Sequence, residues 1–315
     1  MAPLGAGKVG LFAAAGSGGA TGAAFLAGGN GYQDVIAKMP FSTEVIADLA
    51  ATLERGSSGT AGCSDSGVAG YVAGGYNDPL TPKSTDNIDK LTYSNDTAAL
   101  MTPTLTQRRT AAAGMQNSGV AGYFAGGDID GTATYTDIND KLVFASATCS
   151  ATTSLSYSTN TNASFSNSGT AGYSLGGYGG SYQDDIDKFA FPSDTQSALT
   201  ALPYPVAWAG GFADVGVSGY LAGGWEQVAH NVATIYKWAF SNDARTTSSG
   251  SLSVADSQQT GAANSGSAGF VFAGYSGGAT WVDKFAFPTD TRTSLTAMSH
   301  SQYSAAGFAD EGALV

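Results

Sequence analysis

The chain has 315 residues, a formal net charge of -12 and a pI near 4.3. This acidic balance disfavours nucleic acid and anionic membrane as partners, because both repel a surface of the same sign. Hydrophobic residues make up 43% of the chain, which is enough for a core. The sequence contains no uninterrupted run of about 20 apolar residues, the length needed to span a bilayer.

The first predicted element is an apolar segment, residues 1–18. It resembles a signal peptide, with Lys8 ahead of an apolar run. However, residues 13–29 align without a gap on residues 111–127, so cleavage there would remove part of a repeat. We therefore expect an uncleaved segment that docks on another chain through its most apolar side chains, Val9, Leu11 and Phe12.

Residues 19–315 consist of one repeated unit. An aromatic residue followed closely by glycine recurs every 46 to 52 residues, with boxes at Gly28, Gly74, Gly126, Gly176, Gly223 and Gly274. A lysine before an aromatic or apolar run follows each box, at Lys38, Lys90, Lys141, Lys188, Lys237 and Lys284. A period near 50 with glycines closing short apolar runs indicates β-propeller blades, and abundant Gly, Ser and Thr disfavour helices.

Each unit is predicted to form four antiparallel strands. In the third unit these begin with AAAGMQN, continue with GYFAGG and then DKLVF, and end with a Ser/Thr-rich run. Alternation in the third strand places Leu142 and Phe144 on one face and Lys141 on the other.

The first-strand motif occurs once more than the glycine box, because copies stand at both ends of the chain. In the C-terminal copy Phe308 stands where Met115 and Cys63 stand internally, whereas the N-terminal copy has Ser17 there. A buried Phe is worth about 2 kcal/mol more than a Ser, against an extra loop-closure cost of about 1–2 kcal/mol. We therefore predict that residues 305–311 form the inner strand of the first blade and close the ring.

The order of strand, GY-x-A-GG box, variable loop, aromatic strand and LTAM-like strand resembles kelch repeats over residues 9–312. The resemblance implies an all-β fold, a six-bladed kelch-type β-propeller with four antiparallel strands per blade. The tryptophan that kelch repeats usually place at the outermost strand is absent, which weakens any link to cytoplasmic kelch adaptors.

The DK-F-x-F-x-x-DT signature and the opening MAPLGAGKVGLF are similar to kelch-like proteins carried on the virions of tailed bacteriophages. This resemblance implies a non-enzymatic structural or adhesive protein of the virion, for example in the tail. Its rigid disc would present variable loops to the host surface or to neighbouring virion proteins. Those virion proteins would be its partners, reached through the N-terminal segment.

The loops between the glycine box and the aromatic strand vary most, and variable loops on a rigid scaffold are where recognition usually occurs. Candidate binding residues in these loops are Tyr32, Tyr76, Asp128, Asp130, Tyr135, Tyr178, Tyr182, Trp225, Tyr275 and Trp281. Aromatics with nearby Asp suit stacking on host surface glycan, so the alternative function is a free carbohydrate-binding, lectin-like propeller module. The favoured interpretation of the tyrosines is that they pack the loops onto the disc.

Two further patterns have a structural and a functional interpretation. Asp128, Asp130 and Gly131 resemble half a calcium loop without its distal Glu, and we interpret them as a turn, with no metal. The six repeat lysines would form a cation ring for an anionic ligand, or would lie along the blade and point at carbonyls or an Asp. We favour the second interpretation.

The sequence offers little for catalysis. His230 and His300 fall in different units, no GxSxG motif occurs, and no Cys or His spacing fits a metal site. We therefore expect no enzyme and no cofactor. Cys63 and Cys149 are predicted to stay unpaired, with Cys63 as a buried apolar filler.

Overall fold

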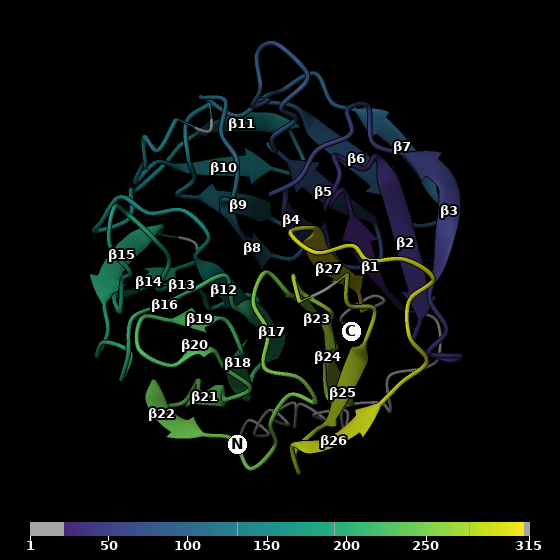
Figure 1. Ribbon diagram of the computed structural model, residues 1–315. Coiled ribbons are helices and arrows are strands. Elements are labelled where there is room, and N and C mark those ends of the chain that lie inside the picture. The colour runs from purple at the N-terminus through teal and green to yellow at the C-terminus, as the bar shows by residue number, and fades with distance from the viewer. Residues whose placement is uncertain (1–21, 131, 192, 277, 312–315) are drawn as a thin grey trace, which may run out of the picture.

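The computed structural model describes residues 22–130, 132–191, 193–276 and 278–311. Their secondary structure is entirely β, and the antiparallel sheets stand in a ring like the blades of a propeller (Figure 1). Within this part of the chain there is no helix with the length and apolarity needed to cross a membrane. The predicted docking arm, with Val9, Leu11 and Phe12, lies outside the described residues.

Six sheets have four strands each, which confirms the predicted repeat unit. We number them in chain order and give their strands from the inner to the outer one: sheet 1 is β27 (Ala306–Asp310), β1 (Ala23–Ala27), β2 (Val35–Pro40) and β3 (Ala47–Thr52); sheet 2 is β4 (Ala61–Asp65), β5 (Ala69–Ala73), β6 (Ile88–Thr92) and β7 (Thr97–Leu100); sheet 3 is β8 (Ala113–Asn117), β9 (Ala121–Ala125), β10 (Asn139–Val143) and β11 (Thr148–Ala151); sheet 4 is β12 (Ala163–Asn167), β13 (Ala171–Leu175), β14 (Ile186–Ala190) and β15 (Thr195–Ala198); sheet 5 is β17 (Gly210–Asp214), β18 (Ser218–Ala222), β21 (Ile235–Ala239) and β22 (Ala244–Thr247); sheet 6 is β23 (Thr260–Asn264), β24 (Ala268–Phe272), β25 (Val282–Ala286) and β26 (Thr291–Ser294). A seventh, small sheet joins β16 (Val206–Ala207), β19 (Trp225–Glu226) and β20 (His230–Asn231).

Burial follows the order of the strands from the centre outward. The second strand of each sheet is buried at every position, because both of its faces are covered by neighbouring sheets. The third strand alternates, with Leu142 buried and Lys141 half-buried, as the period-2 pattern predicts. The outer strand is mostly exposed, which explains its Ser and Thr content.

The glycine box has a steric cause. Gly74 and Gly75 have φ of 67° and 116°, and a Cβ on Gly75 would lie 2.6 Å from the Cβ of Ser57. Sheet 6 corrects the predicted alignment of this box. Ala273 takes the place of the first glycine, since its N–H donates to the Trp281 carbonyl as the N–H of Gly74 donates to Asn87. Gly274 is therefore the second glycine.

The ring is closed by the C-terminal strand. β27 pairs antiparallel with β1, and Phe308 stands opposite Phe25 with ring centroids 5.5 Å apart. This is the place that the sequence comparison of Phe308 with Ser17 indicated. The inner strands β27, β4, β8, β12, β17 and β23 each contact the next around the circle. They approach so closely that a Cβ on Gly114 would lie 1.9 Å from the carbonyl oxygen of Gly62.

A second closed circle stands just ahead of the inner strands, made of one backbone hydrogen bond per sheet. Its members share a left-handed φ of 54° to 64°, and we call them the mouth ring: Gly59, Ala111, Thr161, Trp208, Gln258 and Ser304. Each N–H donates to the carbonyl of the preceding member at 2.7 to 3.0 Å. The N–H of Gly59 donates to Ser304 at 2.8 Å, which completes the circle.

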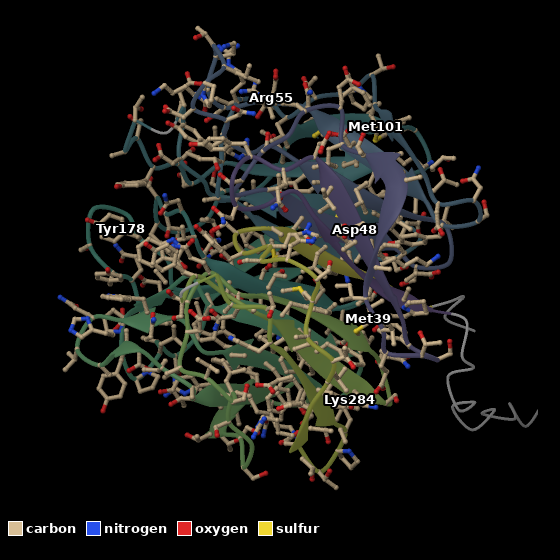
Figure 2. The ribbon with its side chains drawn as sticks, turned by 45° about the vertical axis from the view of Figure 1, so that its right-hand side comes forward. Met39, Asp48, Arg55, Met101, Tyr178 and Lys284 are labelled. Atoms are coloured by element: carbon tan, nitrogen blue, oxygen red, sulfur yellow. The ribbon has the colours of Figure 1, made fainter. Side chains whose placement is uncertain are left out.

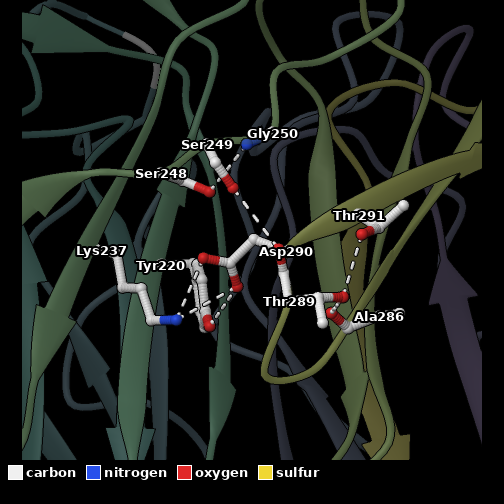
Figure 3. A network of polar contacts seen from close by, with 9 residues as sticks. All are labelled: Tyr220, Lys237, Ser248, Ser249, Gly250, Ala286, Thr289, Asp290 and Thr291. Carbon is white, nitrogen blue, oxygen red and sulfur yellow. Dashed lines mark hydrogen bonds and ion pairs between the residues drawn. The ribbon is translucent and has the colours of Figure 1, made fainter.

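The repeat lysines tie neighbouring sheets together. Lys237 Nζ lies 3.0 Å from a carboxylate oxygen of Asp290 in the next sheet, Tyr220 Oη donates to the same carboxylate at 2.9 Å, and the ammonium stands over the Tyr220 ring (Figure 3). The same lysine position forms four further pairs: Lys38 with Asp96, Lys141 with Asp194, Lys188 with Asp243 and Lys284 with Glu44. These lysines lie within the third strand rather than at its start.

Cys63 and Cys149 are free. Cys63 is fully buried, which confirms the interpretation as a core filler. Both cysteines contribute to one hydrophobic cluster, because sheets 2 and 3 pack face to face. Burial raises the pKa of the Cys149 thiol to about 12, so this group is a thiol and not a thiolate at neutral pH.

Candidate binding face

The two ends of the ring differ. Because the strands alternate in direction, the loops between second and third strands end on the same side as the segments that lead to the next inner strand. We call this side the loop face. Its variable loops are residues 28–34, 74–87, 126–138, 176–185, 223–234 and 273–281. The opposite side, the hairpin face, carries short turns such as residues 66–68 and 118–120.

Most of the predicted aromatic residues lie half-buried on the loop face. Tyr32 and Tyr76 form a tilted pair with ring centroids 6.1 Å apart. Trp225 packs edge-on against His230 at 4.8 Å. Tyr275 is 56% exposed and meets Tyr303 nearly at a right angle. Each of these residues therefore belongs to an isolated pair of rings.

A larger group gathers over sheets 3 and 4, and we call Tyr135, Tyr178, Tyr182 and Trp208 the aromatic cluster. Tyr178 and Trp208 are nearly parallel, at 18°, with centroids 6.4 Å apart. Tyr182 stands edge-on to both, at 5.3 Å and 6.0 Å. Tyr135 adds a second edge contact to Tyr178 at 5.6 Å. Figure 2 shows Tyr178 on the other side of the ring from Met39 and Asp48 of sheet 1.

Trp208 was not predicted as a site residue. It lies in the segment that leads to an inner strand, whereas the candidate binding residues predicted from the sequence all lie in the loops after the glycine boxes. As a member of the mouth ring it has φ of 57°, a conformation that costs a bulky residue about 1–3 kcal/mol. The equivalent member of sheet 2 is Gly59, which adopts this conformation without strain. The only sign of this residue in the sequence is a tryptophan at a position where the other units have smaller or polar residues.

The aromatic cluster has four polar groups: the hydroxyls of Tyr135, Tyr178 and Tyr182 and the indole N–H of Trp208. None of these polar tips has a hydrogen-bond partner within the described part of the chain. In contrast, the hydroxyls of Tyr123 and Tyr173 donate to aspartates between the sheets, at 2.7 and 2.8 Å. Burial raises the pKa of Tyr135 and Tyr182, so both hydroxyls stay protonated at neutral pH.

The remaining predicted residues have structural partners. Trp281 packs against two hydrophobic clusters, one between sheets 5 and 6 and one between sheets 6 and 1, and its indole N–H donates to Asp256 at 3.3 Å. The Asp128 carboxylate accepts the backbone N–H groups of Ala133 and Thr134, as the turn interpretation expected. Asp130 lies 3.8 Å from Arg108. Across the described ranges, no group of three or more His, Cys, Asp or Glu residues could hold a metal ion.

A cavity of about 190 Å³ lies between the inner strands, and the members of the mouth ring are among the residues that line it. Glycine, alanine and serine line most of it, because the closely packed inner strands leave room only for small side chains. Of the described residues along its wall, Glu311 is the single ionisable one. Burial raises the pKa of its carboxyl to about 7. The two histidines lie apart from it, since His230 is exposed beside Trp225 and His300 lies 3.8 Å from Asp48 of sheet 1.

Comparisons with known proteins bear on the fold. No protein-family model matches the chain, and no curated protein matches it. Among solved structures, YjhT is similar with a TM-score of 0.66 and 15% identity, over 84% of this chain and 91% of that chain. Similarity at this level of identity concerns the arrangement of strands alone. Together with the ring of four-stranded antiparallel sheets, it shows that the chain is a β-propeller.

Proposed function

We propose that this chain is a non-enzymatic structural or adhesive protein of a tailed bacteriophage virion. In this proposal a rigid disc presents its loop face to the host surface or to neighbouring virion proteins. The observation that carries it is the contrast between the two faces of the ring. The hairpin face is built of short, similar turns, while the loop face has loops of differing content with half-buried aromatic rings.

The proposal includes six blades of the kelch type, one for each four-stranded sheet. The mouth ring supports this count, because its closed circle of hydrogen bonds takes one member from each of these sheets. The small sheet of β16, β19 and β20 is then an elaboration of the loop face, since its strands belong to the segments around sheet 5. The sequence resemblance to kelch-like virion proteins supports both the kelch type and the virion as the location.

The composition of the axial cavity supports a role without catalysis. General acid–base chemistry needs a pair of groups within hydrogen-bond reach of the substrate. Glu311 is the single ionisable residue of the described cavity wall, and the two nearby carboxylates that help to raise its pKa, Asp214 and Asp310, do not line that wall. Five of the six repeat lysines that a functional cation ring would require are engaged in ion pairs between sheets, with Lys141 bonded to Asp194 at 2.6 Å.

The test is the composition of the particle. Mass spectrometry of purified phage particles should find this chain at a fixed copy number, and antibody labelling in electron micrographs should place it at one part of the particle. A chain that is absent from purified particles but present in the infected-cell lysate would contradict the proposal. Removal of residues 1–18 should leave a folded disc that no longer joins the particle.

The second candidate is a free carbohydrate-binding module, which the aromatic cluster favours, because its rings are held in place while their polar tips are unused. The two candidates are distinguished by location and by binding. A free module binds glycan as an isolated chain and is not found in particles, whereas a purely architectural protein is found in particles and binds no glycan.

A further inference from the structure

We propose that the aromatic cluster is a binding site for an uncharged pyranose of a surface polysaccharide. This inference rests on the proposed role of the loop face in recognition, and it is independent of where in the phage or the cell the chain resides. It is carried by the arrangement of the rings, by the polar groups around them and by the charge of the loops that hold them.

The rings are fixed before any ligand arrives. Tyr182 stands edge-on to both Tyr178 and Trp208, so that the two nearly parallel rings are held at a centroid distance of 6.4 Å. The backbone of Tyr178 exchanges two hydrogen bonds of 2.9 Å with Asn160, and that of Trp208 is held in the mouth ring. Aromatic side chains ordered in this way lose little entropy on binding, and their flat faces suit the C–H face of a sugar ring.

Polar groups suited to hydroxyls surround these rings. The phenol hydroxyls of Tyr178 and Tyr182 both donate and accept, and the indole N–H of Trp208 donates; none has a partner among the described residues. Thr161, next to Trp208 in the mouth ring, donates its hydroxyl to the Asn160 amide oxygen at 3.4 Å and can still accept, and the Asn160 amide nitrogen has no acceptor among the described residues. A neutral sugar, whose hydroxyls can act in both roles, matches this set.

The charge of the site selects against acidic sugars. The two loops that carry the tyrosines, residues 126–138 and 176–185, contain no lysine or arginine and contribute five aspartates: Asp128, Asp130, Asp137, Asp184 and Asp185. Charges of one sign close together disfavour a ligand of the same sign. The net charge of -12 acts in the same direction.

The other aromatic contacts of the loop face lack this combination. Tyr76 donates its hydroxyl to Asp78, and its ring lies under Lys83. Tyr275 and Tyr303 meet at 84°, so they offer no pair of parallel faces. These sites therefore serve as internal controls on the same face of the same protein.

The test uses the full chain, purified alone, against dextran, mannan and galactan, with polygalacturonate as the anionic counterpart. We expect binding to at least one neutral polymer, measured by calorimetry, and weaker or no binding to polygalacturonate. Trp208→Gly should weaken neutral binding at least tenfold while the protein stays folded, because Gly adopts the left-handed backbone without strain, as Gly59 does at the equivalent position of sheet 2. Tyr275→Ala should leave binding unchanged.

A second variant, Tyr182→Ala, removes the edge contacts to Tyr178 and Trp208 without changing the mouth ring. It should weaken neutral binding to the same extent, and it provides the test on its own if Trp208→Gly does not fold. Neutral binding that survives in both variants overturns the inference, and so does binding of polygalacturonate alone. Binding to none of the three neutral polymers also overturns it. None of these outcomes changes the result of the particle analysis, so the two proposals fail separately.

Discussion

Two contacts between neighbouring sheets pair their charged side chains differently. Between sheets 3 and 4, Asp194 accepts hydrogen bonds from Tyr123 at 2.7 Å and from Lys141 at 2.6 Å, near the rim of the ring. Between sheets 2 and 3, the position equivalent to Asp194 is Ala147, with a similar φ of 50°. Lys90 therefore lies over the Tyr71 ring, and it forms no ion pair within the described part of the chain.

The contact between sheets 2 and 3 has its charge pair inside instead. Arg109 and Asp140 are both fully buried, with Nη1 2.9 Å from the carboxylate, and Nη2 donates to the Phe124 carbonyl at 2.9 Å. Asp140 also accepts from the backbone N–H and the hydroxyl of Thr106. A rim pair can therefore be missing without loss of the repeat. A buried pair cannot lose one partner, because the other would remain charged and unsolvated.

Arg109→Ala should therefore destabilise the fold more than any other substitution considered below. It leaves Asp140 buried without its cation and should lower the free energy of unfolding by about 3–5 kcal/mol. Urea denaturation followed by fluorescence measures it. The control is Arg108→Ala, whose exposed side chain lies 3.8 Å from Asp130 and should change stability by less than about 1 kcal/mol. Equal effects of the two variants would contradict the assignment.

The next effect is expected from Asp194→Ala, which converts the contact between sheets 3 and 4 into a copy of the one between sheets 2 and 3. Loss of the acceptor for Tyr123 and Lys141 should cost about 1–3 kcal/mol. The pair is only partly exposed, at 19% and 16% of the two side chains, so solvent screens it little. A midpoint of urea unfolding that does not move would show that the rim pairs add nothing.

A smaller and graded effect should separate Lys188→Met from Lys90→Met. Lys188 is bonded to Asp243 at 2.6 Å, and its removal should cost about 1 kcal/mol. Lys90 has only the Tyr71 ring as a partner, so its removal should change the free energy of unfolding by less than about 0.5 kcal/mol. Melting temperatures measured side by side test the ranking. If Lys188→Met left melting unchanged but abolished ligand binding, the structural role of these lysines would be refuted.

The smallest effect is a gain. Ala147→Asp should supply the missing acceptor for Lys90 and raise the free energy of unfolding by about 0.5–1 kcal/mol. Asp also tolerates the left-handed backbone at this position better than Ala. The part of the gain that comes from the ion pair should shrink in 1 M salt and disappear in a Lys90→Met background. A gain that persists in both conditions would come from the backbone and not from a new ion pair.

Local patterns in the sequence determined the repeat, the strand order and the character of each strand. The aromatic-glycine box and the alternation around Lys141 are properties of adjacent residues, so they can be recognised in the sequence without a structure. The choice between Phe308 and Ser17 was also local, because it asked only which side chain suits one buried position. β27, which carries Phe308, occupies that position beside β1. The sequence also limited the chemistry, with two histidines and no catalytic motif.

Contacts between sheets were decided by the tertiary structure alone. They join residues about 50 positions apart, as Lys141 and Asp194 are, and no local period reveals which partners face each other. The burial of Arg109 and the gathering of Trp208 with Tyr178 arise in the same way, because the segment that leads to an inner strand folds back on the sheets and loops beside it. Periodicity dictates how a strand forms, whereas the packing of one sheet on the next selects which side chains meet.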